Sequence, residues 1–170
     1  MKQFVVSIVV LLSFLSVYSD DFTEQKGGHV YTIEVPDYMV KTYQLNETAS
    51  LQYQCVSKYA YMVVIDDAKQ KLQDVGFKFV GAKVFLNVYL ESYNTEAKNR
   101  KVGSVEEFKS NGYDHAQTEM TWTEGKTDYY LLITCVETKD YFYKILCWTT
   151  QKNKDKLKKD FLRISKSLKD

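Results

Sequence analysis

Two runs of β-forming residues, 128–137 and 141–150, constrain the fold of this chain more than any other stretch. Both runs are rich in aromatic and β-branched residues, and the polar tripeptide 138–140 separates them, which predicts a long β-hairpin. If the last two residues of the tripeptide form a two-residue loop, Thr134 lies opposite Ile145. In that register both faces of the hairpin are largely apolar, which is typical of interior strands covered on each side. The sequence therefore predicts this hairpin at the centre of a sheet.

Four further segments have strand patterns. The side chains of residues 29–36 would alternate between the two faces of a strand. The strand is expected to end at Pro36, the only proline, which cannot donate a hydrogen bond to a β-ladder. The other three segments are residues 49–65, which predict a hairpin of two strands (49–56 and 59–65), residues 101–108 and residues 112–123, and the last two join the central hairpin in a meander.

Helix patterns occupy three places. Asp66 and Asp67 predict the start of a short helix that Gly76 ends, because acidic residues complement the helix dipole. Residues 82–100 fit both helical spacing and alternation, and the length and polar tail of this stretch favour a helix. A final helix from Asn153 or Lys154 carries one apolar stripe, formed by Leu157, Phe161, Ile164 and Leu168, which predicts packing on the sheet. Its many lysines indicate a solvated outer face, with an anionic membrane as the alternative partner.

The first 19 residues have the pattern of a secretory signal peptide. One cation, Lys2, precedes an apolar and serine-rich run, and the small-residue ending predicts cleavage after Ser19. The run is shorter than the ~20 apolar residues that span a bilayer, and no later stretch is long enough. We expect a secreted or periplasmic protein without a transmembrane segment. The triplet that begins at Asn46 is a glycosylation acceptor pattern, which matters only in a eukaryotic source.

The expected mature chain forms one domain. Residues 20–28 are polar and end in two glycines, which predicts a flexible leader before a single domain over 29–170. Its fold class is α+β, an antiparallel sheet of about six to seven strands flanked by helices. Removal of the predicted signal peptide, residues 1–19, leaves 23 − 1 = 22 cations and 22 anions, so the mature chain is neutral. A neutral chain lacks the basic field that gathers nucleic acid, so nucleic acid is not an expected partner.

Three cysteines, Cys55, Cys135 and Cys147, cannot all pair within one chain. In the register above Cys147 lies opposite Leu132, three residues from Cys135. At ~3.3 Å per residue this separation exceeds the ~7 Å limit between bridged Cα atoms, which disfavours a Cys135–Cys147 disulfide. Cys55 could bridge either cysteine if its strand lies beside the hairpin, and the alternative is three thiols that pack as small hydrophobes.

The order of motifs along the chain carries a family resemblance. The motifs are Tyr31-Thr-Ile-Glu-Val-Pro36, the hairpin over 49–65, a helical middle, Asn111-Gly112-Tyr113 before a strand, the stretch from Tyr129-Tyr130 to Trp148, and a last helix that ends Ile164-Ser-Lys-Ser-Leu168. This order resembles the PsbP-like superfamily, which also includes the nuclear Ran-binding protein Mog, over most of the mature chain. The resemblance implies an α/β/α sandwich in proteins known mainly as binding or assembly partners.

Catalytic and metal-binding patterns are not found in the sequence. His29 and His115 are far apart and belong to no metal-ligand motif, so we expect surface or strand-end residues. Ser110 lies near His115, but no nucleophile-elbow motif is present. The acidic pairs 66–67 and 106–107 would point to opposite faces of a strand. We therefore expect a protein that is not an enzyme and holds no cofactor or metal.

Aromatic residues supply the candidate contacts. Fourteen tyrosines and two tryptophans suit both strands and recognition surfaces, and we take Trp122, Trp148, Tyr129 and Tyr143 as candidate partner or ligand contacts. The expected function is an exported, non-enzymatic binding or assembly module. The alternative is a carrier that holds a small apolar ligand between sheet and helices. A large cavity under the helix at 82–100 would favour the carrier, and an exposed aromatic patch would favour the module. The partner and the oligomeric state stay open.

Overall fold

A computed structural model of the chain describes residues 21–28 and 30–170. The predicted signal peptide, its cleavage site after Ser19 and the side chain of His29 lie outside these residues.

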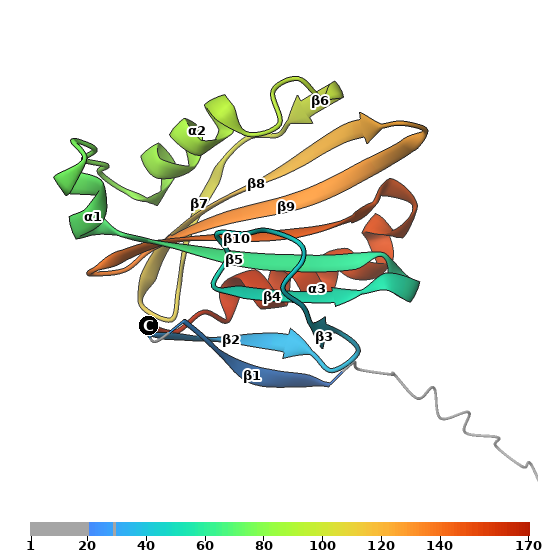
Figure 1. Cartoon of the computed structure of the whole chain (residues 1–170), viewed down its shortest axis with the longest axis horizontal. Coiled ribbons are helices and arrows are strands. Elements are labelled where there is room, and N and C mark those ends of the chain that lie inside the picture. Colours follow the sequence, from blue (N-terminus) through green and yellow to red (C-terminus); the bar gives the residue numbers. More distant parts are fainter. Residues whose placement is uncertain (1–20, 29) are drawn as a thin grey trace, which may run out of the picture.

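An antiparallel sheet of eight strands forms the centre of the molecule (Figure 1). Its strands are β3 (Val40–Lys41), β4 (Leu51–Cys55), β5 (Ala60–Ala68), β6 (Lys98–Val102), β7 (Glu106–Ser110), β8 (Tyr113–Glu124), β9 (Thr127–Glu137) and β10 (Tyr141–Thr150). Their order is β3-β4-β5-β10-β9-β8-β6, and β7 also pairs with β8. The α+β class is as predicted. The sheet has more than six to seven strands because β3 adds a short edge and the stretch predicted as one strand over 101–108 is two, β6 and β7.

The central hairpin has the predicted register. Ile145 pairs with Thr134, and strands β10 and β9 are fourth and fifth in the order of the sheet. The amide of Thr138 donates to the carbonyl of Tyr141 at 3.0 Å, which closes the two-residue loop. One face of the hairpin belongs to one buried cluster and the other face to a second, so both faces are covered as expected.

Helices cover the two faces of the sheet, in an α/β/α arrangement. The helices are α1 (Lys69–Asp74), α2 (Ala82–Ser92) and α3 (Lys154–Lys166), with short 3₁₀ turns at Val56–Lys58 and Gln151–Asn153. Helix α3 buries Leu157, Phe161 and Ile164 of the predicted stripe, and Leu168 is buried just after the helix ends; all four are at most 5% exposed. Helix α2 buries Phe85, Leu86 and Leu90 against the other face.

Residues 22–27 correct the prediction of a flexible leader. They form strand β1 (Phe22–Gly27), which pairs with β2 (Tyr31–Pro36) in a separate two-stranded ribbon on the α3 side of the sheet. The guanidinium of Arg163 lies 4.0 Å from the centre of the Phe22 ring, and the Tyr53 hydroxyl donates to Gln25 at 2.9 Å. These contacts come from distant parts of the chain, so the polar sequence of the segment gives no sign of them.

Two predicted helix boundaries are wrong. Asp66 and Asp67 belong to strand β5, and the ion pair of Asp67 with Lys144 at 2.6 Å on the neighbouring strand satisfies the charge. Helix α2 ends at Ser92 rather than near residue 100, because Asn94 adopts the left-handed conformation with φ of 53°. The guanidinium of Arg100 then donates to the carbonyls of the last helical turn and the next residue, including Leu90 O at 2.7 Å.

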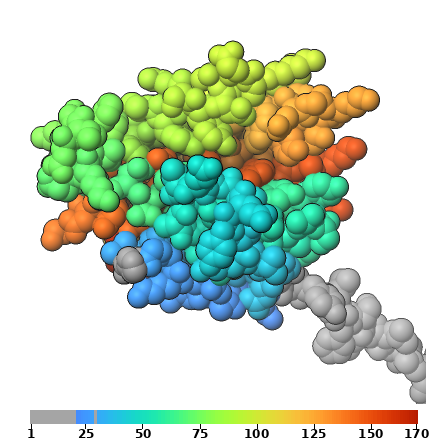
Figure 2. All heavy atoms as spheres, in the orientation of Figure 1, coloured from blue at the N-terminus to red at the C-terminus, as the bar shows by residue number. Residues whose placement is uncertain are grey.

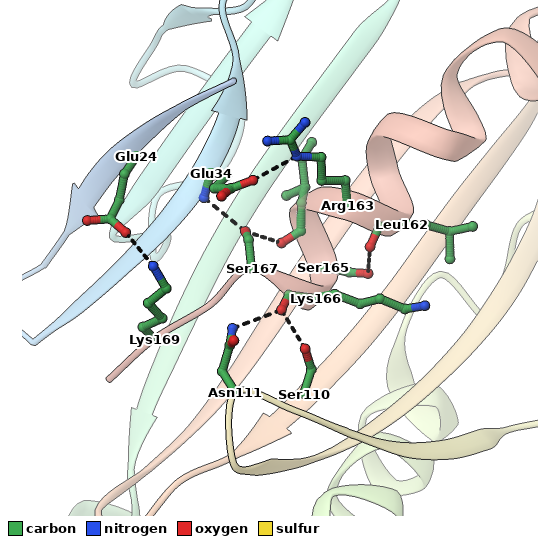
Figure 3. A network of polar contacts seen from close by, with 11 residues as sticks. Glu24, Glu34, Ser110, Asn111, Leu162, Arg163, Ser165, Lys166, Ser167 and Lys169 are labelled. Carbon is green, nitrogen blue, oxygen red and sulfur yellow. Dashed lines mark hydrogen bonds and ion pairs between the residues drawn. The ribbon is translucent and has the colours of Figure 1, made fainter. Parts of the chain in front are cut away.

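The C-terminal segment ties three parts of the fold together (Figure 3). Lys169 exchanges two backbone hydrogen bonds with Thr32 of β2, at 2.8 and 2.9 Å. The Asn111 side chain, at the β7–β8 turn, donates to the carbonyls of Lys166 and Leu168 at 3.0 and 2.9 Å. The side chain of Leu168, in the same segment, is fully buried. The segment therefore joins α3, the β1–β2 ribbon and the main sheet.

The three cysteines are free thiols. Cys135 packs in the cluster on the α2 side of the sheet and Cys147 in the cluster on the α3 side, so the sheet itself separates them. Cys55 is half-buried, with its sulfur 3.4 Å from the hydroxyl of Ser57. The prediction that Cys135 and Cys147 do not bridge is confirmed, and neither bridge to Cys55 forms.

Thiol labelling of the native protein is expected to modify Cys55 alone. Burial raises the pKa of Cys135 and Cys147 far above the usual value for a thiol, and both side chains are fully inaccessible. Mass spectrometry after brief iodoacetamide treatment at neutral pH should therefore find one adduct, and three after unfolding in guanidinium. Rapid labelling of Cys135 or Cys147 in the native state would contradict their place in the two cores.

Candidate functional site

Four aromatic side chains, here termed the aromatic stripe, lie across four neighbouring strands. Tyr61 of β5 pairs with Trp148 of β10, and Tyr129 of β9 pairs with Trp122 of β8. The rings of the first pair stack with centres 5.4 Å apart and those of the second pair with centres 5.1 Å apart. Trp148 also pairs with Leu131, two residues from Tyr129, so the two stacks are diagonal neighbours on one face. All four side chains are half-buried.

An open cleft of about 690 Å³ adjoins the stripe. Trp122 and Trp148 line it from the sheet, and the segment that follows α2 lines it with Tyr93, Asn94, Glu96, Ala97 and Lys98. Trp122 also lines a second hollow of about 320 Å³ together with Tyr129. Figure 1 shows that the tip of the β8–β9 hairpin extends past the C-terminal end of α2. The stripe and its cleft lie at this end.

The length of α2 explains why this end of the sheet stays open. A helix of 11 residues is about 16 Å long, whereas the 12 residues of strand β8 span about 40 Å. Helix α2 therefore covers the middle of the sheet face and leaves its far end without a helix. Tyr93, which follows α2, adds a ring to the lining of the cleft, and the Tyr89 ring in the last turn of the helix packs against it with centres 5.0 Å apart.

The cleft has a polar rim of mixed charge. Glu96, Glu124 and Lys98 give it a net charge of 1 − 2 = −1. The second hollow holds one cation and one anion, Lys101 and Asp128. Aromatic faces with a nearly neutral polar rim suit contact with an uncharged or weakly charged surface.

Three of the four candidate contact residues therefore come together, and Tyr143 does not. Tyr143 is fully buried on the opposite face of the sheet, where its ring packs edge-on against Tyr31 with centres 4.9 Å apart. Burial raises the pKa of Tyr143 well above the usual value for a phenol, and the side chain is a core residue. Sequence reasoning missed Tyr61, because its place beside Trp148 depends on how the two hairpins pair, and no local pattern encodes that pairing.

Comparison with known proteins identifies the fold. No protein-family model matches the sequence, and a search of curated proteins finds no match. Among solved structures, cyanobacterial PsbP (CyanoP) from Synechocystis sp. PCC 6803 matches with a TM-score of 0.64, covering 94% of this chain and 98% of that chain at 13% identity. The fold is PsbP-like. A Pseudomonas aeruginosa protein of unknown function, described as a putative regulator, covers 83% of this chain and 91% of its own at a TM-score of 0.48 and 14% identity.

At such identity the likeness extends to the fold alone, so membership of the superfamily stays a prediction. The partner of this PsbP-like domain must therefore be inferred from its own surface. Among residues 21–28 and 30–170, no three histidine, cysteine, aspartate or glutamate side chains come together as a metal site.

His115 is buried rather than exposed at a strand end, which corrects the expectation from sequence. Its side chain is 1% exposed, and its ring stacks on Phe108 with centres 4.9 Å apart. Its Nδ1 lies 3.1 Å from the carbonyl of Tyr113, and its Nε2 has no hydrogen-bond partner among the described residues. The Ser110 hydroxyl donates to the carbonyl of Lys166 at 2.8 Å. The side chains of Ser110 and His115 thus contact different backbone carbonyls.

The stability of the protein is expected to fall at mildly acidic pH because of His115. Burial lowers the pKa of His115, despite the opposing effect of Asp114, so the folded state favours neutral imidazole. The unfolded chain binds the proton below about pH 6.5, so the stability from this residue is complete above that pH and declines as pH falls toward the folded pKa. Urea unfolding at several pH values should show a smaller decline for His115→Phe. Equal declines for the two proteins would contradict the prediction.

Proposed function

We propose that this chain is an exported, non-enzymatic binding or assembly module whose aromatic stripe contacts a partner protein. The observation that carries the proposal is the pairing of Trp122 with Tyr129 and of Trp148 with Tyr61 beside an open cleft. Tryptophan and tyrosine supply a large share of the binding energy at protein interfaces. Their rings bury apolar area while their polar tips stay available for hydrogen bonds.

The stacked rings favour binding because they are held in place before a partner arrives. Each ring packs on its cross-strand neighbour, so little side-chain freedom remains to be lost on association. The strands beneath, β8, β9 and β10, belong to the centre of the sheet and give the stripe a rigid base. Polar side chains around the cleft, such as Asn94 and Thr123, supply the hydrogen-bonding rim that interfaces of this kind carry.

The rival function, a carrier of a small apolar ligand, has less support. Phe85 of α2 stacks on Phe142 of β10 with ring centres 4.5 Å apart, and Leu86 is fully buried. The space between α2 and the sheet is thus filled by side chains where a carried ligand would lie. The cleft beside Trp122 and Trp148, of about 690 Å³, lies beyond the end of α2 and is open to solvent, whereas ligand pockets bury most of a ligand's surface.

Export is part of the proposal and rests on the sequence pattern of residues 1–19. No helix in the described part of the chain is long and apolar enough to cross a membrane.

Native mass spectrometry of the protein purified from its own host tests the proposal. We expect the wild-type protein to carry a protein partner that the double variant Trp122→Ser, Trp148→Ser loses, because two interface anchors together contribute at least about 30-fold in affinity. Tyr43→Ser is the matched control, since Tyr43 is 76% exposed and follows edge strand β3. A co-purifying small molecule in place of a protein partner would instead identify a carrier, and its loss from the double variant would locate it at the stripe.

A further inference from the structure

A second exposed apolar surface begins at the other end of α2. Its members are Val75, Phe77, Val80, Val84 and Val88, which are 69%, 54%, 76%, 46% and 40% exposed. They come from the loop between α1 and α2 and from the outer side of α2, and we term them the α1–α2 surface. Figures 1 and 2 show that α1 and this loop form one end of the molecule, away from the tip of the β8–β9 hairpin. Five exposed apolar side chains over one loop and the helix that follows it are a grouping of the kind that marks an interaction site.

The loop is pinned to the body of the protein, so its exposed side chains have a fixed place. Phe79 points inward, with its ring centre 5.0 Å from that of Phe85 and 6.1 Å from that of Phe142. Phe77 stacks on Phe79 with ring centres 6.0 Å apart, and its amide donates to the carbonyl of Leu72 at 2.8 Å. The loop therefore presents Phe77 on top of an anchored ring.

The outer side of α2 continues this surface. Val84 and Val88 are one helical turn apart and lie on the same side of the helix. An outer helix face of a protein surrounded by water is normally polar. Two exposed valines in this position, on the helix that follows the apolar loop, extend the α1–α2 surface along the helix.

The charge beside the surface is positive. Segment 69–83 holds Lys69, Lys71, Lys78, Lys83 and Asp74, and two of its four lysines are neutralised by carboxylates of strands β9 and β7, which leaves a net charge of 2 − 1 = +1. Lys69 and Lys83 form ion pairs with Glu137 and Glu107, each at 2.7 Å. Lys71 of α1 and Lys78 of the loop between α1 and α2 are both exposed.

We propose that the α1–α2 surface docks on an anionic membrane. Phe77 and the valines enter the boundary between headgroups and acyl chains, and Lys71 and Lys78 contact the anionic headgroups. The shape of the surface favours a lipid partner over a protein. Interface anchors of proteins are mostly Trp, Tyr and Arg seated in pockets, whereas these members are valines and one phenylalanine that project from a loop and a helix.

The basic helix α3 is a weaker candidate for membrane contact, because three of its six cations form ion pairs within the chain and its apolar stripe is buried. Lys154 and Lys158 both pair with Glu119, and Arg163 pairs with Glu34. Its apolar stripe is buried against the sheet. A helix whose apolar side already packs on protein has none to insert into lipid.

Vesicle co-sedimentation of the mature protein tests this inference. We expect the wild-type protein to bind vesicles of phosphatidylcholine with phosphatidylglycerol more tightly than vesicles of phosphatidylcholine alone. The double variant Phe77→Ser, Val80→Ser should bind the anionic vesicles at least about tenfold more weakly, because it removes the largest exposed side chain and the most exposed side chain of the loop. Lys71→Glu with Lys78→Glu should abolish the preference for anionic lipid. Val40→Ser and Val56→Ser, each at a residue 62% exposed outside this surface, should bind as the wild type does.

Three results would overturn the inference. The first is no binding of the wild-type protein to either vesicle. The second is equal binding by the wild type and the Phe77→Ser, Val80→Ser variant. The third is a dimer in light scattering that this variant converts to a monomer without any vesicle binding, which would assign the surface to a second copy of the chain. Unchanged melting temperatures of the variants, expected for exposed side chains, separate lost docking from lost folding.

Discussion

Replacement of Phe161 with alanine is expected to lower the free energy of unfolding by about 3–5 kcal/mol. The Phe161 side chain is fully buried where α3, the β1–β2 ribbon and the sheet meet, so its removal leaves a cavity that fixed strands on one side cannot close. Urea unfolding followed by far-UV circular dichroism measures the change.

Lys159→Ala, on the exposed side of the same helix, is the control for Phe161→Ala. It should change the free energy of unfolding by less than about 0.5 kcal/mol. A loss below about 1 kcal/mol for Phe161→Ala would mean that α3 contributes little to the core on its side of the sheet.

Deletion of residues 168–170 is expected to destabilise the protein by at least about 3 kcal/mol, or about 6 °C in melting temperature. The deletion removes the buried side chain of Leu168 and the two backbone hydrogen bonds between Lys169 and Thr32. Each such hydrogen bond contributes about 0.5–1.5 kcal/mol. Differential scanning calorimetry of the mature protein measures the effect.

Two point variants divide the effect of that deletion. Leu168→Ala should account for about 2–5 kcal/mol, because it removes the buried side chain and keeps the backbone contacts. Lys169→Ala removes an exposed ion pair with Glu24 and should leave the melting temperature nearly unchanged. A deletion variant as stable as the wild type would show that the C-terminal segment does not hold the ribbon to the sheet.

The parts of the fold that were predictable are those whose pattern is local. The hairpin of β9 and β10 follows from two apolar faces and a two-residue loop, which together fix its register. Helix α3 follows from the spacing of Leu157, Phe161 and Ile164. In both elements the short-range preference and the tertiary environment agree.

Other parts depend on contacts between distant residues and could not be predicted. Strand β1 has one large apolar residue, Phe22, and its pairing with β2 has no local signature. Asp67 has a low preference for strands, yet Lys144 on the adjacent strand compensates for its charge. Tertiary context decided both segments.

The candidate site was half predictable for a related reason. The register of the central hairpin already separates Trp148 from Tyr143, which lie on opposite faces. Which face is open depends on where α2 ends, and the polar sequence after Ser92 gives no clear stop. The exposed end of the sheet, and with it the stack of Tyr61 on Trp148, became apparent only from the three-dimensional arrangement.

Site-specific photocrosslinking in the native host tests the binding role of the aromatic stripe most directly. A benzophenone side chain would replace Tyr129 or Tyr61 in the stripe, or Tyr43 at the β3 edge as a control. We predict a covalent adduct to one and the same protein from both stripe positions and none from Tyr43. If the crosslinker at Tyr43 alone formed the adduct, or if neither stripe position formed one, the aromatic stripe would not be the binding surface.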